Sequence, residues 1–376
     1  MKQTRKVTPH EVSRSGKPRV LVRGLTGSHG GLETFLLEQY RELRNDIDFW
    51  FLAYGSEVPY GADEITRGGG RICYVTPRSK NAVKNIADLV SLLRRGKFNA
   101  VWLNQSGIRA LEPLVLAWVM RVPVRALHAH SSSNMGTKTQ GLAHRILRPL
   151  ALRTANTYLA CSSSAAKWFF GDRNALVVPN SFNVRAFDYS AHSRELLRSE
   201  FAIDRRTPLI AQVGALRPEK NHSFSLEVLA ALHHEGIRAI LVFAGAGPLQ
   251  PELESKSAKL GIADSVIFLG STGSVPALLS ASDLALQPSI FEGLPYAVLE
   301  AQASGLPCLI SDTISPEVVV SDKTQRLPLG DASEWASAAK QKLMSLDGRR
   351  SNEVMDTRFD SAQSASYLRR LLLQGQ

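Results

Sequence analysis

The stretch Ser289-Ile290-Phe291-Glu292-Gly293-Leu294-Pro295-Tyr296-Ala297-Val298-Leu299-Glu300 places two carboxylates on either side of a Gly-Leu-Pro turn. The apolar run before it, residues 283–288, is typical of a strand, and a proline near a first helical position favours a helix from Pro295 onward. Such a turn directs free backbone amides and the positive end of a helix toward the space above the strand, which favours a phosphate there. We expect Glu300, in the second helical turn, to accept hydrogen bonds from a ribose or sugar hydroxyl.

The bulk composition indicates a soluble protein with an anionic partner. The chain has 376 residues, enough for two ordinary domains, and its 44% hydrophobic and 21% charged content is typical of globular proteins. Its three cysteines are far apart in the sequence, which favours a reducing compartment over a disulfide framework. They also lack the paired spacing of a zinc site. No segment reaches the roughly 18 apolar residues of a membrane-spanning helix. The net charge of +11 suits a nucleic acid, a phospholipid surface or a nucleotide-linked substrate, and does not choose between them.

Short apolar runs alternate with helical patterns along the whole chain. This alternation predicts an α/β protein with two doubly wound, Rossmann-like domains facing a cleft, with ligands beyond the carboxyl ends of the strands. The expected parts are a flexible basic leader (1–17), an N-terminal domain (18–184), a C-terminal domain (185–355) and a closing helix (356–376), with a linker at 179–190. The predicted strands are 19–24, 49–53, 72–76, 100–104, 124–129, 158–161, 175–178, 209–214, 239–244, 265–269, 284–287 and 307–310. The predicted helices are 31–43, 82–95, 108–120, 142–152, 223–234, 251–260, 275–281, 296–304 and 332–346.

Four loops that follow strands in the second half each suit an anion or a nucleotide. Arg217 and Lys220 follow the strand 209–214, a Gly-Ala-Gly-Pro-Leu turn follows 239–244, and Gly270-Ser271-Thr272 follows 265–269. The fourth loop is the Glu292–Glu300 stretch. Each loop alone has an ordinary explanation, since basic turns are usually solvated and tight strand–helix turns need glycine regardless. Their recurrence at one sheet edge predicts a nucleotide site.

These loops resemble the donor domain of the retaining glycosyltransferases of family four, which have the GT-B fold. The matching stretches are 213–222, 245–249, 268–270 and 291–300, and the likeness to exopolysaccharide and capsule-type members spans roughly residues 19 to 376. The resemblance implies that Lys220 holds the donor diphosphate, Glu292 contacts the donor sugar and Glu300 binds the ribose. It also assigns to the donor site Arg217, Gly247, Leu269, Gly293 and Leu294. The family usually has arginine where this chain has Ala215, and Arg217 is the candidate replacement.

The first half is similar to the same family at two places, so the resemblance implies that residues 18–184 form the acceptor-side domain and residues 185–355 the nucleotide-sugar donor domain. Gly30-Gly31-Leu32-Glu33-Thr34-Phe35 resembles its glycine-rich loop, so the resemblance implies that Gly30 and Gly31 approach the donor phosphate across the cleft; a plain helix cap is the alternative for Glu33. The stretch 125–131 resembles an Arg-x-x-His-x-His pattern of exopolysaccharide-type members. We expect a catalytic role for His128 rather than His130, although a lone histidine is more often structural.

The resemblance implies a hexosyltransferase of the EC 2.4 type that transfers a sugar from a nucleotide diphosphate-sugar, UDP-linked, with retention. The expected acceptor is a hydroxyl of a saccharide or lipid-linked molecule in surface polysaccharide synthesis. No metal cofactor is expected, because the one Asp-x-Asp, Asp46-Ile47-Asp48, enters its strand at the amino end. Two alternatives stay open: a sugar-nucleotide epimerase of the same fold, and a non-catalytic binding module, which the Ala215 departure supports. Nucleic-acid binding ranks last, since no recognition helix or aromatic platform is evident.

Two basic, partly apolar patches in the first half have two interpretations. The first patch comprises Arg78, Lys80, Lys84, Arg94, Arg95 and Lys97. The second comprises Lys138, Arg145, Arg148 and Arg153 among Leu142, Ile146, Leu147 and Leu150. They are either solvated helix faces or an attachment site for an anionic membrane leaflet. The expected location is the cytoplasm, with peripheral attachment to the inner face of the cell membrane as the second interpretation.

Overall fold

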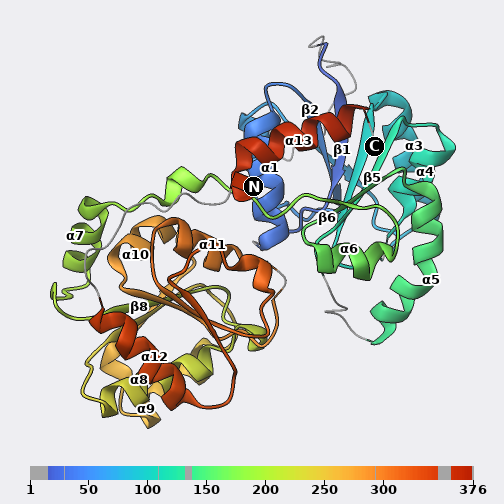
Figure 1. Cartoon of the computed structure of the whole chain (residues 1–376). Helices are drawn as coiled ribbons and strands as arrows, with labels where there is room; N and C mark the ends of the chain where they lie inside the picture. The colour runs from blue at the N-terminus through green and yellow to red at the C-terminus, as the bar shows by residue number, and fades with distance from the viewer. Residues whose placement is uncertain are drawn as a thin grey trace.

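The computed structural model describes residues 16–28, 30–108, 110–131, 138–292, 294–345 and 357–374. These residues form two α/β halves, each built around a parallel sheet (Figure 1). The first sheet has seven strands in the order β3-β2-β1-β4-β5-β6-β7, and the second has six in the order β10-β9-β8-β11-β12-β13. The first-sheet strands are β1 (Arg19–Arg23), β2 (Asp48–Tyr54), β3 (Arg71–Val75), β4 (Ala100–Gln105), β5 (Val124–Ala129), β6 (Thr157–Ala160) and β7 (Leu176–Val177). The second-sheet strands are β8 (Leu209–Val213), β9 (Ile240–Ala244), β10 (Val266–Gly270), β11 (Leu284–Gln287), β12 (Cys308–Ser311) and β13 (Thr324–Leu327).

Both strand orders reverse direction at one point, between β1 and β4 and between β8 and β11. Loops leave the sheet in opposite directions at such a switch point, so ligands bind there at the carboxyl ends of the strands. The α/β, doubly wound fold class expected from the sequence is therefore confirmed.

The α-helices are α1 (Gly31–Leu43), α2 (Ala62–Arg67), α3 (Ala82–Gly96), α4 (Glu112–Val119), α5 (Lys138–Thr154), α6 (Ser163–Phe170), α7 (Ala191–Glu200), α8 (His222–His234), α9 (Gln250–Lys259), α10 (Val275–Ala281), α11 (Tyr296–Ala303), α12 (Ala332–Met344) and α13 (Ser361–Gln374).

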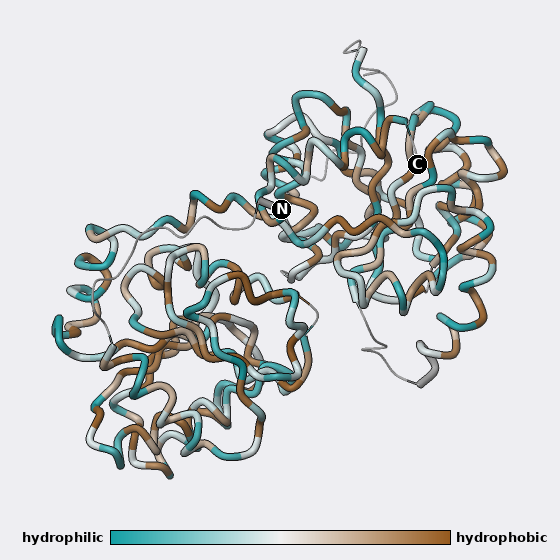
Figure 2. Tube along the Cα trace, viewed as in Figure 1, coloured by the Kyte–Doolittle hydropathy of each residue, from teal (hydrophilic) through white to brown (hydrophobic). Residues whose placement is uncertain are grey.

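The strands are apolar on both faces because helices cover both. On β1, Val20 and Val22 belong to one core cluster with Phe35 of α1, whereas Leu21 belongs to another with Leu89 of α3. Successive side chains of a strand point to opposite faces, so β1 contributes to both clusters. In Figure 2 the central strands of both halves are predominantly hydrophobic and many outer turns are hydrophilic.

The last helix, α13, returns to the first half and packs against α1 (Figure 1). Ala365, Leu368, Leu371 and Leu372 are buried in the same core cluster as Val20. The Ser361 hydroxyl donates a hydrogen bond to Oε1 of Glu42 on α1, at 2.7 Å. The C-terminal helix thus completes the N-terminal core, which makes the two halves interdependent.

Several predicted elements differ from the observed ones. The helix expected from residue 108 begins at Glu112, where Pro113 occupies the first turn. The sequence reading missed α2, α6, α7 and β13; the last has the polar sequence Thr-Gln-Arg-Leu with only Leu327 buried. Nearly all of the expected leader 1–17 lies outside the described residues, and the domain boundaries at 184/185 and 355/356 stay predictions.

Candidate active site

Two adjacent strands of the second sheet, β8 and β11, bring Lys220 and Glu292 together. Lys220 ends a short 3₁₀ helix, η2 (Pro218–Lys220), and its Nζ forms an ion pair with Oε1 of Glu292. Both side chains are largely buried, with exposed fractions of 20% and 15%. The amide of Ile290 also donates to the carbonyl of Glu219 at 2.9 Å, so the two loops are joined through backbone as well. A cation and a carboxylate therefore share the carboxyl edge at the switch point.

Two further polar residues hold the Glu292 carboxylate in place. Gln287 Nε2 and Ser289 Oγ each donate to Glu292 Oε1 at 3.1 Å. Gln212, at the end of β8, donates from Nε2 to the Lys220 carbonyl at 2.8 Å and fixes that loop. Sequence reasoning missed Gln287, Ser289 and Gln212. The signal that could have found them is a polar side chain at the carboxyl end of an otherwise apolar strand.

The glycine turn after β9 has a backbone reason for its composition. A Cβ at Gly245 would lie 1.9 Å from the Gly214 carbonyl oxygen, and one at Gly247 would lie 2.3 Å from the Leu216 oxygen. The amide of Leu216 donates to the Ala246 carbonyl at 3.1 Å, so the two loops continue the β8–β9 pairing. Close backbone packing in a tight turn therefore explains both Gly245 and Gly247, whether or not a ligand binds there. A donor contact by Gly247 stays a prediction.

The other residues predicted to bind the donor lie around this edge, and their roles in donor binding stay predictions. Arg217 is exposed, Ala215 is half-buried and Leu269 is half-buried near the end of β10. Leu294 is buried, and its carbonyl accepts a hydrogen bond from Asn180 Nδ2 at 2.9 Å, which ties the turn to the linker. Gly293 lies outside the described residues.

Helix α11 begins at Tyr296, as the predicted helix 296–304 does, with Pro295 as its N-cap. The amides of a first helical turn have no intrahelical acceptor, so this end can bind an anion. The Tyr296 hydroxyl donates to the Ser181 carbonyl at 3.3 Å, and a Cβ at Gly31 would lie 3.7 Å from the Tyr296 ring. The start of α11 therefore touches the start of α1, and the loops before the two helices are neighbours.

Glu300 is half-buried on α11, and burial, together with a smaller effect of the charge of Glu38 on α1, raises its pKa to about 7. Burial likewise raises the pKa of Glu38, against the lowering effect of Arg41. The carboxyl group on α1 of one half thus acts electrostatically on the carboxyl group on α11 of the other. A protonated or half-protonated Glu300 can donate as well as accept a hydrogen bond, which suits a hydroxyl ligand.

Glu33 closes the loop between β1 and α1 rather than capping the helix. Its Oε1 accepts hydrogen bonds from the Thr26 hydroxyl at 2.7 Å and the Thr26 amide at 3.2 Å. No side chain caps α1, whose N-cap residue is Gly30. A Cβ at Gly30 would lie 2.9 Å from Glu33 Oε2, so a larger residue there would displace this carboxylate oxygen. Contacts of Gly30 and Gly31 with a donor phosphate stay predictions.

The structure distinguishes the two histidines of the 125–131 stretch. His128 is fully buried on β5, with its ring stacked on Trp102 and edge-on to Phe35, and burial places its pKa well below the ordinary value. His130 is half-buried just beyond the strand, with Nε2 2.9 Å from Asn104 Oδ1. The predicted preference for His128 conflicts with this burial, because a core side chain cannot reach a bound sugar. His130 is the better placed of the two rings.

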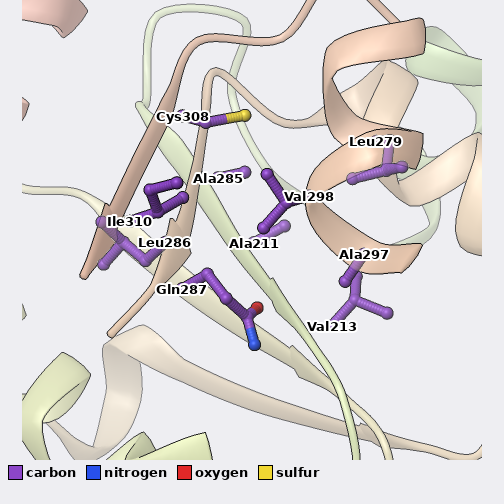
Figure 3. A pocket seen from close by; sticks show the side chains of 10 residues that line it. All are labelled: Ala211, Val213, Leu279, Ala285, Leu286, Gln287, Ala297, Val298, Cys308 and Ile310. Carbon is purple, nitrogen blue, oxygen red and sulfur yellow. The ribbon is translucent and has the colours of Figure 1, made fainter. Parts of the chain in front are cut away.

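A small cavity lies between the second sheet and α10 and α11 (Figure 3). It is lined mainly by small apolar side chains, among them Ala211, Ala285 and Cys308, and by Gln287. Its volume of about 10 Å³ approaches that of a single water molecule. This cavity is a packing defect under the helix and cannot hold a nucleotide.

Within the described residues, no group of three or more His, Cys, Asp or Glu side chains is arranged to hold a metal ion. The same part of the chain contains no helix that is both long and apolar enough to cross a membrane.

A family model described as "Glycosyl transferases group 1" matches residues 193–355, which include the Lys220–Glu292 pair. The chain is 32% identical to EpsF of Bacillus subtilis (strain 168), over 81% of this chain and 82% of that protein. EpsF is named as a glycosyltransferase. The chain belongs to the group 1 glycosyltransferases. It is therefore an enzyme that transfers sugars, and its two-domain architecture is GT-B.

Other similar proteins agree with the family and the fold. This glycosyltransferase is 26% identical to the Escherichia coli UDP-Gal:alpha-D-GlcNAc-diphosphoundecaprenol alpha-1,3-galactosyltransferase, over 75% of this chain and 76% of that enzyme. Its fold matches Anabaena HepE, solved with UDP and glucose, at a TM-score of 0.75 and 18% identity, covering 94% and 99% of the two chains. The Methanocaldococcus jannaschii UDP-GlcNAc 2-epimerase also matches, at 0.63 and 12%, covering 95% and 99%. Fold alone thus does not separate transferases from epimerases.

Proposed function

We propose that this glycosyltransferase moves a sugar from a UDP-sugar to a hydroxyl of a saccharide or lipid-linked acceptor, with retention of the anomeric configuration. The observation that carries the proposal is the Lys220–Glu292 ion pair at the switch point between β8 and β11. The relative that uses a UDP-sugar and a diphosphoundecaprenol-linked acceptor, and the neighbour solved with UDP, support this choice of donor and acceptor.

In this proposal each side chain has a distinct task. Negative charge grows on the leaving diphosphate while positive charge grows on the sugar, so fixed groups that match these charges stabilise the transition state more than the ground state. We assign the Lys220 ammonium and the first-turn amides of α11 to the diphosphate. Glu292, oriented by Gln287 and Ser289, contacts the donor sugar, and Glu300 binds the ribose. These groups can support transfer without a metal ion, which is part of the proposal.

Replacing Lys220 with alanine tests the proposed donor site. We expect Lys220→Ala to lower kcat/KM for the donor at least about 100-fold, because a charge-assisted contact to the diphosphate is lost. The matched control is Lys256→Ala, which removes another lysine paired with a glutamate, on α9 of the same half. Transfer rates across a panel of nucleotide-sugars measure the effect. Equal kcat/KM values for the donor in Lys220→Ala and Lys256→Ala would contradict the proposal.

The chemical details have separate readouts. Nuclear magnetic resonance of the product's anomeric carbon establishes retention or inversion, and activity in excess chelator establishes whether a metal is required. Incubation of a labelled nucleotide-sugar without acceptor distinguishes the epimerase alternative, which would convert the donor unaided. Failure of every nucleotide-sugar to bind would favour the non-catalytic alternative.

We extend the proposal to attachment at the inner, cytoplasmic face of an anionic membrane. Leu142, Ile146 and Leu150 lie one helical turn apart on α5 and are 58%, 65% and 42% exposed. Arg145 and Arg153 on the same helix are exposed as well. An amphipathic helix with an exposed apolar row and flanking cations is typical of interfacial binding.

The double variant Leu142→Ser/Ile146→Ser tests this attachment. We expect at least about a tenfold weaker association with phosphatidylglycerol vesicles at moderate salt, because the apolar row no longer enters the interface. Leu196→Ser is the control, since Leu196 on α7 of the other half is 58% exposed. Wild-type protein that ignores the vesicles would contradict the attachment and leave the transfer reaction untouched.

A further inference from the structure

A pocket of about 290 Å³ opens at the carboxyl edge of the first sheet, where β1, β2 and β4 end. Leu25, Leu32, Ala53 and Pro59 form its apolar walls. This combination of apolar surface with a few polar groups is typical of small-molecule sites, and the size suits one sugar ring with a substituent. The pocket lies in the half opposite the donor loops, at the matching sheet edge.

The pocket is next to the proposed donor site. Leu32 lines it, and the preceding residue, Gly31, faces the ring of Tyr296 at the start of α11. Thr26, another lining residue, is held by Glu33 of α1. Gly31 and Leu32 therefore connect the pocket to the start of α11, on the side from which an acceptor must approach to receive a sugar.

Arg23 is the feature of this pocket that general packing does not explain. It is the last residue of β1, half-buried, and the one cation among the lining residues that the structure describes. Its Nε donates to the Tyr54 hydroxyl at 3.3 Å, and its guanidinium carbon lies 5.6 Å from the centre of the Tyr54 ring. Within the described part of the chain, its terminal nitrogens make no hydrogen bond. Tyr54 thus orients the guanidinium while leaving its fork open.

Glu57, the one carboxylate among the described residues that line the pocket, does not neutralise Arg23. Glu57 Oε1 accepts a hydrogen bond from the Gly27 amide at 2.9 Å, and it forms no ion pair with Arg23. An arginine fork fixed by an aromatic ring matches a carboxylate or phosphate with two parallel hydrogen bonds. A partly desolvated cation without a counter-ion is costly unless a ligand supplies the negative charge.

We infer that this pocket binds the acceptor and that Arg23 selects acceptors bearing an anionic group beside the sugar, either a phosphate ester or a carboxylate. That the bound molecule is the acceptor rests on the proposed function, whereas the binding of an anion at Arg23 does not depend on it. Arg23 is a specificity-determining residue in this scheme, not one that takes part in the chemical step.

Binding of three probes tests the inference without requiring transfer. The probes are geranyl diphosphate, methyl glucuronide and neutral methyl glucoside, each titrated calorimetrically. We expect wild type to bind one of the two anions more tightly than methyl glucoside, and Arg23→Gln to weaken that anion about 10- to 100-fold. The anion that binds identifies the source of the charge. Arg23→Lys should restore part of the affinity.

Two controls separate this site from other cationic sites. Arg71→Gln removes an arginine that stacks on Trp50 at the amino end of β3, at the opposite edge of the same sheet, and should leave binding unchanged. Lys220→Ala should also leave the anion's affinity unchanged, since it disrupts only the donor side. Kinetically, Arg23→Gln should raise the KM for a charged acceptor while KM for the donor stays within about twofold.

Three results would overturn the inference: no anion bound by wild type, equal affinity in Arg23→Gln, or loss of binding in Lys220→Ala instead. None of these depends on whether sugar is transferred. Failure of the proposed function would show instead as an absence of transfer in wild type with intact, Arg23-dependent anion binding.

Discussion

At the scale of single residues, the carboxyl group of Glu300, which we assign to the proposed donor site, also affects the stability of the protein. Its pKa of about 7 lies above the ordinary value of 4.5, chiefly because burial disfavours the charged form. The folded state therefore holds the proton more tightly than the unfolded state. The stabilisation is fully present below about pH 4.5 and is lost as the pH rises through 7.

Replacing Glu300 with glutamine should flatten this pH dependence. Between pH 4.5 and 7 we expect the wild-type free energy of unfolding to fall relative to Glu300→Gln by about 1–3 kcal/mol. Urea titrations at several pH values measure the difference. Glu252→Gln, on the exposed side of α9, is the control. Parallel curves for wild type and Glu300→Gln would show that Glu300 titrates normally in the folded protein.

At the scale of elements, the β8 and β9 loops meet so closely that their glycines are obligatory. Adding a methyl group at Gly245 would place it 1.9 Å from a backbone oxygen, a contact that only movement of the chain can relieve. We expect Gly245→Ala to lower the free energy of unfolding by about 2–4 kcal/mol. Thermal and denaturant unfolding measure it. Gly273→Ala, whose Cβ would meet nothing within 4 Å, should change stability little.

The same loops show why a glycine motif alone predicts a ligand weakly. Gly245 and Gly247 satisfy a packing demand whether or not a nucleotide binds. The Lys220–Glu292 pair is better evidence, because placing two largely buried charges together has no comparable packing explanation.

At the scale of the whole molecule, the C-terminal helix α13 makes the first half depend on the end of the chain. Leu368 is fully buried against the core that contains Phe35 and Val20. Leu368→Ala should destabilise this half by about 2–5 kcal/mol, through lost burial and the cavity left behind. Ser366→Ala, on the exposed side of α13, is the control.

Hydrogen exchange locates the effect of Leu368→Ala. We expect the amides of β1 and β2, in the first sheet, to lose protection more than those of β8 and β9, in the second. Equal loss in both sheets would mean that the protein unfolds as one cooperative unit. No change in β1 would contradict the packing of α13 on the N-terminal core.

The sequence by itself determined the alternation of strands and helices, and hence the two parallel sheets. It also determined that Lys220, the Gly245 turn and Glu292 each follow a strand of the same sheet, at its carboxyl edge. These features are readable because hydrophobic periodicity and turn chemistry are local properties of the chain. Elements with polar or very short sequences, such as β13 and α7, were missed because their formation depends on neighbours far along the chain.

Only the tertiary structure decided how individual side chains are surrounded. It buried His128 while leaving His130 at the edge, paired Lys220 with a carboxylate 72 residues away and set Glu300 opposite a carboxyl group of α1. It also left the Arg23 fork open over Tyr54. Burial, charge pairing and pKa arise from contacts between segments that are distant in the chain. No local pattern encodes them, because each depends on which surfaces the folded sheets and helices bring together.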